Sequence, residues 1–167
     1  MKLLISLIGI ILISFNSYSK NLKFNVSSST NSEFDFPHNI IFYVNNNNNK
    51  FAKELKRNLI TYLGESNFNV TTDSLRANVF LEINVENVIE DQSLNTKLFI
   101  KDKKQNIFWR SSLKDKLKDI KGNEKSITKA MMWTLGKNFS GKIKINEKNN
   151  KVLTKYKWQS SLFLRYI

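Results

Sequence analysis

Apolar residues follow a helical period more clearly in one stretch of the chain than anywhere else. Over residues 51–64 they recur every three to four positions, while mostly charged and polar residues occupy the positions between them. This spacing predicts an amphipathic helix whose single apolar face packs on a sheet. Asn49 stands at the expected N-cap and Gly64 at the expected C-cap. A short apolar run of β-favouring residues over 39–44 predicts a buried strand just before this helix.

Apolar and polar residues alternate in the stretch that follows the helix. The alternation covers 79–86, 94–100 and 107–111, and it predicts three half-buried strands joined as an antiparallel meander. A shorter apolar run at 68–71 predicts another strand between the helix and this meander. Farther along the chain, apolar residues spaced three and four apart over 127–139 predict a second helix.

Together these elements predict an α+β domain over 39–141. Their order is β-α-β-β-β-α, which places the helices on one face of a mainly antiparallel sheet and gives a two-layer sandwich. Residues 20–38 are polar and serine-rich with a short apolar alternation, and they predict either a flexible lead or an edge strand. Residues 142–167 predict an extra C-terminal β-hairpin followed by a tail.

The first 19 residues have the pattern of a signal peptide. Lys2 precedes an apolar run over 3–13, and small or polar residues follow that run. Ser17 and Ser19 occupy the −3 and −1 positions that signal peptidase accepts, so we predict cleavage before Lys20. The alternative is a retained membrane anchor, but the apolar run is shorter than the roughly 20 residues that span a bilayer. We therefore expect an exported chain with no transmembrane span after cleavage, located in the periplasm or, alternatively, secreted.

Composition excludes several kinds of catalytic and metal site. The chain contains no cysteine, so it has no disulfide, thiolate metal site, cysteine nucleophile or lipid-modified cysteine. His38 is the only histidine and stands beside Pro37, where a structural role is commoner than catalysis. Glu82 and Glu86 share a strand face, but that face is the hydrated one, and catalytic carboxylates are usually buried. We therefore expect a non-enzymatic protein with no cofactor and no metal.

Positive charge is concentrated in the C-terminal part of the chain. The formal net charge is +13, and residues 101–167 hold eighteen of the 27 lysine and arginine residues but only five of the 14 acidic ones. This asymmetry predicts an anionic partner: a lipid head group, lipopolysaccharide, a glycan polymer or nucleic acid. Nucleic acid is the least expected of these, because lysine far outnumbers arginine and export separates the chain from it. The alternative is that the lysines only solvate the surface.

The predicted C-terminal hairpin carries the clearest candidate for an anion-binding surface. Lysines alternate with other residues before and after a turn at 147–150, so one face of the hairpin is lysine-rich and the other is apolar and aromatic. Each lysine near an anionic membrane contributes about 1 kcal/mol of binding free energy. The first hypothesis is binding to an anionic lipid or glycan surface of the cell envelope through Lys142, Lys144, Lys155 and Lys157.

Aromatic residues near the C-terminus carry a second hypothesis. Exposed aromatic side chains often anchor protein interfaces, although they also complete cores. We interpret them as a surface that docks on a protein of an envelope assembly or secretion machine; a secreted, virulence-associated protein is a further alternative. The candidate docking residues are Tyr156, Trp158, Phe163 and Tyr166.

The predicted helix over 51–64 and the segments 68–70, 76–81 and 107–111 carry a resemblance to a group of bacterial domains. They resemble the small α/β domain of envelope accessory proteins: the TolB amino-terminal domain, the lipoprotein activators of penicillin-binding proteins and the lipopolysaccharide-assembly lipoprotein. The sequence looks closest to a related envelope family of unknown function. The resemblance implies a packing scaffold in the cell envelope and no particular reaction. Most members are anchored through a cysteine, which this chain lacks, so an outer-membrane anchor is not implied.

Overall fold

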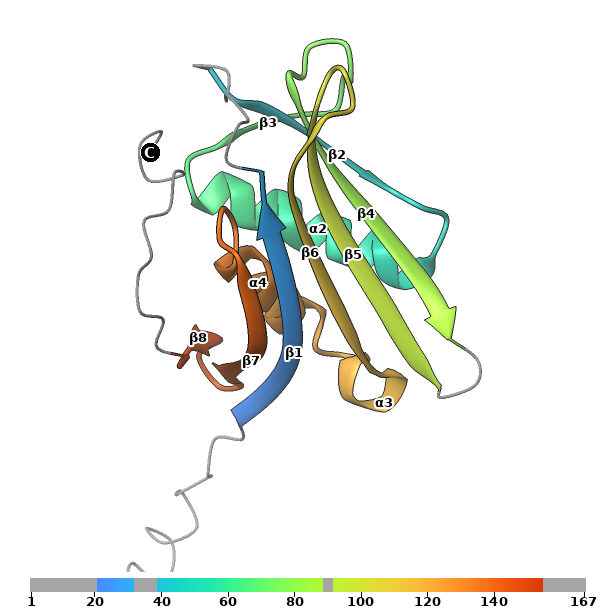
Figure 1. Ribbon diagram of the computed structural model, residues 1–167, viewed down its shortest axis with the longest axis vertical. Coiled ribbons are helices and arrows are strands. Elements are labelled where there is room, and N and C mark those ends of the chain that lie inside the picture. The colour runs from blue at the N-terminus through green and yellow to red at the C-terminus, as the bar shows by residue number, and fades with distance from the viewer. Residues whose placement is uncertain (1–20, 32–38, 89–91, 155–167) are drawn as a thin grey trace, which may run out of the picture.

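The structure of the chain is a computed structural model that describes residues 21–31, 39–88 and 92–154. Within these residues, eight strands form one sheet in the order β3-β2-β4-β5-β6-β1-β7-β8, and the two longer helices lie on one of its faces (Figure 1). The strands are β1 (Asn21–Thr30), β2 (Ile41–Asn46), β3 (Asn69–Thr71), β4 (Val79–Val88), β5 (Ser93–Asp102), β6 (Ile107–Lys116), β7 (Phe139–Asn146) and β8 (Lys151–Val152). The helices are α2 (Lys50–Glu65), α3 (Leu117–Ile120) and α4 (Glu124–Trp133).

Most strand pairs are antiparallel, and both parallel pairs involve β2. This strand pairs in parallel with β3 and β4, whereas the other neighbouring strands are antiparallel. Parallel neighbours require a crossover connection, and α2 supplies it between β2 and β3. The predicted α+β class, with helices on one face of a mainly antiparallel sheet, is confirmed, and so is the meander of β4, β5 and β6.

Helix α2 begins where the sequence predicts but ends two residues later. The Asn49 side chain accepts a hydrogen bond from the Phe51 backbone N–H at 2.8 Å, which confirms the N-cap. At the other end the C-cap is Ser66, so the prediction of Gly64 as C-cap is wrong. Asn67, with a φ of 62°, adopts the left-handed conformation that ends the helix. Asparagine tolerates this conformation better than most residues, which is why glycine is not required there.

The second helix, α4, is shorter than its apolar spacing predicts. It ends at Trp133, and Gly136, with a φ of 68°, then turns the chain in the left-handed conformation that glycine adopts readily. Phe139 is therefore the first residue of β7 and not part of a helix. Its ring packs edge-on against Trp133 with the centroids 5.5 Å apart. The apolar spacing continues past the helix because both aromatic residues pack against the same core.

Strand β1 lies inside the sheet, which corrects the prediction of a flexible lead or an edge strand for this segment. It pairs with β6 on one side and with β7 on the other. Leu22, Phe24 and Val26 are buried in the core, and the polar residues between them are exposed. Both partner strands lie far along the chain, so the local pattern showed the alternation but not the two neighbours.

A β-bulge brings two consecutive aromatic residues of β6 into the core. The register between β5 and β6 shifts near the start of β6, and Phe108 and Trp109 are both buried, with exposed fractions of 2% and 0%. The simple alternation predicted Ile107 on the face of Trp109, but Ile107 is exposed. The Trp109 indole Nε1 donates a hydrogen bond to the Thr134 backbone carbonyl at 3.0 Å. This bond ties the middle of the sheet to the end of α4.

Strands β7 and β8 form the predicted C-terminal hairpin, with a turn at 147–150. Ile143 and Ile145 are buried, whereas Lys142 and Lys144 are exposed. The predicted division into an apolar and a lysine-rich face is therefore confirmed for β7. No helix in the part of the chain that the structure describes is both long and apolar enough to cross a membrane.

Candidate anion-binding groove

The face of the sheet opposite α2 and α4 is called the open face (Figure 1). Charge is unevenly distributed across this face. On β4, Glu82 and Glu86 form ion pairs with Lys101 and Lys97 of β5. On the next three strands, β6, β1 and β7, the described charged side chains of the open face are basic and exposed. They are Lys23, Arg110, Lys114, Lys116, Lys142 and Lys144. One half of the open face is thus neutralised, and the other half is cationic.

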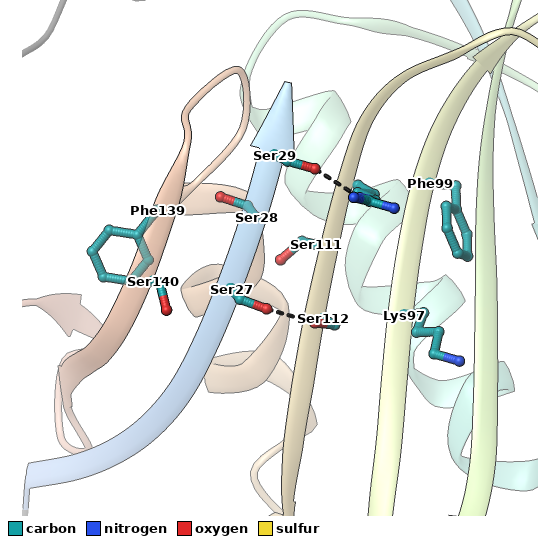
Figure 2. A pocket seen from close by; sticks show the side chains of 10 residues that line it. Ser27, Ser28, Ser29, Lys97, Phe99, Ser111, Ser112, Phe139 and Ser140 are labelled. Atoms are coloured by element: carbon teal, nitrogen blue, oxygen red, sulfur yellow. Dashed lines mark hydrogen bonds between the residues drawn. The ribbon is translucent and has the colours of Figure 1, made fainter. Parts of the chain in front are cut away.

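A groove of about 530 Å³ crosses the open face where β5, β6, β1 and β7 lie side by side (Figure 2). Six serines, two cationic side chains and two phenylalanines line it. The cationic side chains are Lys97 and Arg110, and the phenylalanines are Phe99 and Phe139. The groove therefore combines serine hydroxyls, positive charge and the aromatic ring of Phe99 in one place, whereas the ring of Phe139 packs against Trp133 in the helical layer.

The groove exists because the strand register places small side chains next to one another on neighbouring strands. Ser27 of β1 lies directly opposite Ser112 of β6 and Ser140 of β7. Lys97 of β5 lies opposite Ser112 on the other side. Three neighbouring strands thus present serine at the same level, where longer side chains would fill the space. The hydroxyls of Ser27 and Ser112 are hydrogen-bonded to each other at 2.7 Å (Figure 2).

Arg110 is the cationic side chain that is held most directly at the groove. Its Nε donates a hydrogen bond to the Ser29 hydroxyl at 2.7 Å. Within the residues that the structure describes, no carboxylate lies within ion-pair distance of its guanidinium. The other N–H groups of the guanidinium are suited to bind a carboxylate or phosphate in a two-pronged geometry. Lys97 differs, because Glu86 lies 3.3 Å from its Nζ and offsets part of its charge.

A second hollow of about 310 Å³ continues the groove toward the lysines predicted from the sequence. It shares three serines with the groove, and Asn25 and Lys114 also line it. Lys142 lies directly opposite Asn25, and Lys144 lies opposite Lys23 of β1. The two predicted lysines of β7 and the groove are therefore on the same face, on neighbouring strands.

The loop after α4 fixes one edge of the groove. The Ser28 hydroxyl donates to the Lys137 backbone carbonyl at 2.8 Å. The Lys137 Nζ in turn donates to the Trp133 backbone carbonyl at 2.9 Å and lies 4.3 Å from the centroid of the indole ring. Burial lowers the pKa of the Lys137 amine below its ordinary value. These contacts hold the start of β7 beside β1 at the edge of the groove.

Half of the predicted lysines and all of the predicted docking aromatics fall outside the described residues. These are Lys155, Lys157, Tyr156, Trp158, Phe163 and Tyr166. Their proposed roles stay predictions. The single histidine, His38, also lies outside the described residues, and no group of three potential metal ligands occurs among the residues that are described.

The residues that build the groove were not singled out from the sequence. Ser27, Ser29 and Ser112 belong to two short serine clusters, at 27–29 and 111–112, which are common in loops and carried no signal of a site. Arg110 is one of four arginines, and no local pattern distinguishes it from the other three as a binding residue. Only the pairing of β1 with β6 brings these residues together.

No family model and no curated protein matches the sequence. Solved structures share its fold at low sequence identity. A PDZ domain protein from Parabacteroides distasonis has a TM-score of 0.54 and 10% identity over 81% of this chain and 41% of that chain. A DUF4136 family protein from Bacteroides thetaiotaomicron has a TM-score of 0.50 and 8% identity over 67% of this chain and 95% of that chain. PelC from Paraburkholderia phytofirmans has a TM-score of 0.43 and 11% identity, over 66% and 94% of the two chains.

At these identities the similarity shows the fold alone. The fold is that of a small bacterial α/β domain, which confirms the coarser part of the resemblance seen in the sequence. The similarity does not support any particular one of the named envelope families. The chain spans about 41% of the length of the Parabacteroides protein, so the match concerns one part of that protein.

Proposed function

We propose that the protein is a non-enzymatic accessory protein of the bacterial cell envelope, and that its open face binds an anionic envelope component. The observation that carries this proposal is the cationic half of the open face. Arg110, Lys142 and Lys144 are exposed there, and none of them forms an ion pair within the described residues. Cations that are not paired with a carboxylate attract an external anion more strongly than cations that are already neutralised.

The sequence supports a location of the protein outside the cytoplasm. The first 19 residues have the pattern of a signal peptide, which supports export to the periplasm or secretion from the cell. The resemblance of the sequence to domains of bacterial envelope proteins agrees with such a location. Outside the cytoplasm, the abundant anionic surfaces are phosphate-bearing lipids, lipopolysaccharide and acidic glycans.

The proposal predicts that the protein lacking residues 1–19 binds anionic vesicles, lipopolysaccharide or a soluble polyuronate more tightly than neutral counterparts. Replacing Lys142 and Lys144 with glutamine removes two charges, and about 1 kcal/mol per lysine corresponds to roughly thirtyfold weaker binding for the pair. Binding is also expected to weaken at high salt, because salt screens exposed charges. Sedimentation with phosphatidylglycerol vesicles, and with polyuronate-coated beads, at low and high salt measures these effects.

A matched control distinguishes the loss of charge on the open face from a general loss of net charge. Lys53 and Lys125 are exposed on α2 and α4, so the variant Lys53→Gln/Lys125→Gln loses the same two charges from the helical layer. This variant should bind like the wild type. Equal recovery with neutral and anionic partners, or equal losses in the two double variants, would contradict the proposal.

A further inference from the structure

The shape of the open face distinguishes between two kinds of anionic partner. The groove and the second hollow share three serines, so together they form one depression along β6, β1 and β7. A membrane surface is broad and can contact the protruding lysines, but it cannot enter the depression and reach the serines at its bottom. A single polymer chain can enter it. The depression therefore favours a chain-like ligand over a bilayer.

The hydroxyl groups of the groove match a ligand that is itself rich in hydroxyls. Each serine hydroxyl both donates and accepts a hydrogen bond, so neighbouring serines can bind the hydroxyls of a sugar in either direction. Ser27 and Ser112 already bond to each other, which shows that the register brings such groups within hydrogen-bonding distance across strands. Ser140, which is exposed on the neighbouring strand, extends the row.

The charged and apolar groups of the groove complete this match. The bond from Arg110 Nε to the Ser29 hydroxyl fixes the guanidinium beside the serines, where it can bind a carboxylate or phosphate. Phe99 of β5 is half-buried and lines the same groove, and an aromatic ring can pack against the C–H face of a sugar ring.

We infer that the groove formed by β5, β6, β1 and β7 binds one segment of an anionic glycan chain, with Arg110 holding a carboxylate or phosphate of the glycan and the serines bonding its hydroxyls. This inference rests on the proposed function and specifies its ligand. It also adds a binding residue, Arg110, to the lysines predicted from the sequence.

Two variants test the groove separately from the lysines of β7. Arg110→Gln removes the charge that holds the anion, and Ser112→Tyr fills the depression without changing any charge. The matched control is Arg57→Gln, because Arg57 is exposed on α2 in the other layer and the charge change is identical. Thermal unfolding of each variant shows whether it is folded. If Ser112→Tyr does not fold, Arg110→Gln still tests the groove, because the Arg110 side chain is exposed and lies outside the core.

The probes are an oligogalacturonate hexasaccharide, the neutral maltohexaose, inorganic phosphate, phosphatidylglycerol vesicles and a single-stranded oligothymidylate, each titrated into the protein lacking residues 1–19 by calorimetry. The oligogalacturonate is expected to bind more tightly than maltohexaose or phosphate. Losing a charge-assisted, two-pronged contact is expected to weaken its binding by about tenfold or more in Arg110→Gln. Ser112→Tyr should weaken it similarly while leaving vesicle binding unchanged, and Arg57→Gln should have no effect.

Several outcomes overturn the inference. Unchanged oligogalacturonate binding in both Arg110→Gln and Ser112→Tyr would place any glycan elsewhere on the protein. Tighter binding of the oligothymidylate, lost in Arg110→Gln, would identify the groove as a nucleic-acid site. Vesicle binding that depends on Lys142 and Lys144, with no binding of the hexasaccharide, would leave the proposed function standing and reject the glycan. Absence of binding to every anionic probe would reject both.

Discussion

Replacing Trp109 with alanine is expected to lower the free energy of unfolding by about 3–5 kcal/mol, the usual cost of removing a large aromatic side chain from a core. Trp109 is completely buried, and its indole N–H donates to the Thr134 backbone carbonyl at 3.0 Å. The substitution therefore opens a cavity between the sheet and α4 and removes one of the two hydrogen bonds that the Thr134 carbonyl accepts; the other comes from the Lys137 backbone N–H at 3.0 Å. Because domains of this size are stable by only about 5–15 kcal/mol, much of the stability should be lost. Urea unfolding followed by circular dichroism measures the change.

The variant Trp109→Phe separates the two contributions. Phenylalanine keeps much of the packing but cannot donate a hydrogen bond to the Thr134 carbonyl, so the expected loss from the missing bond is about 0.5–1.5 kcal/mol. A loss below about 1 kcal/mol in Trp109→Ala would contradict the position of this residue in the core, since such a value is typical of a surface site.

Replacing Phe24 with alanine is expected to destabilise the protein by a similar amount, about 3–5 kcal/mol. Phe24 has an exposed fraction of 1%, and it lies opposite Ile143 within the sheet. The effect is large only because β1 is an interior strand, whose buried residues pack against the helical layer. A flexible lead or a frayed edge strand would tolerate the same change.

The neighbouring substitution Lys23→Ala provides the control. Lys23 is exposed on the open face, so its replacement should change stability by no more than about 0.5 kcal/mol. Chemical unfolding of both variants in the same buffer gives the comparison. Small and equal effects at Lys23 and Phe24 would show that β1 is not part of the folded sheet.

The elements that depend on local periodicity were predicted from the sequence. The four-residue spacing of Leu55, Leu59 and Leu63 gave α2, because that spacing puts their side chains on one helical face, where all three are buried. The alternation over 79–86 gave β4 in the same way, with every second residue buried. Lys142 and Lys144 were correctly predicted on the exposed face of their strand, because they alternate with buried isoleucines.

The features that depend on long-range pairing were not predicted. The local sequence of β1 predicts only a short polar strand, because its interior position depends on its pairing with β6 and β7. The end of α4 was missed because Phe139 continues the helical spacing while its backbone belongs to β7. The groove was missed for a related reason. Arg110 and its partner Ser29 are separated by 81 residues, so no local pattern reports their contact.

The claim that the open face binds an anionic ligand is tested most directly by NMR titration of the isotopically labelled protein lacking residues 1–19. Adding the oligogalacturonate hexasaccharide is predicted to shift the backbone amide signals of 27–29, 110–112 and 140–144, and to leave those of α2 unchanged. These three segments belong to neighbouring strands, so a shared response would locate one binding site. Shifts confined to the helices, with these strands unaffected, would contradict the claim.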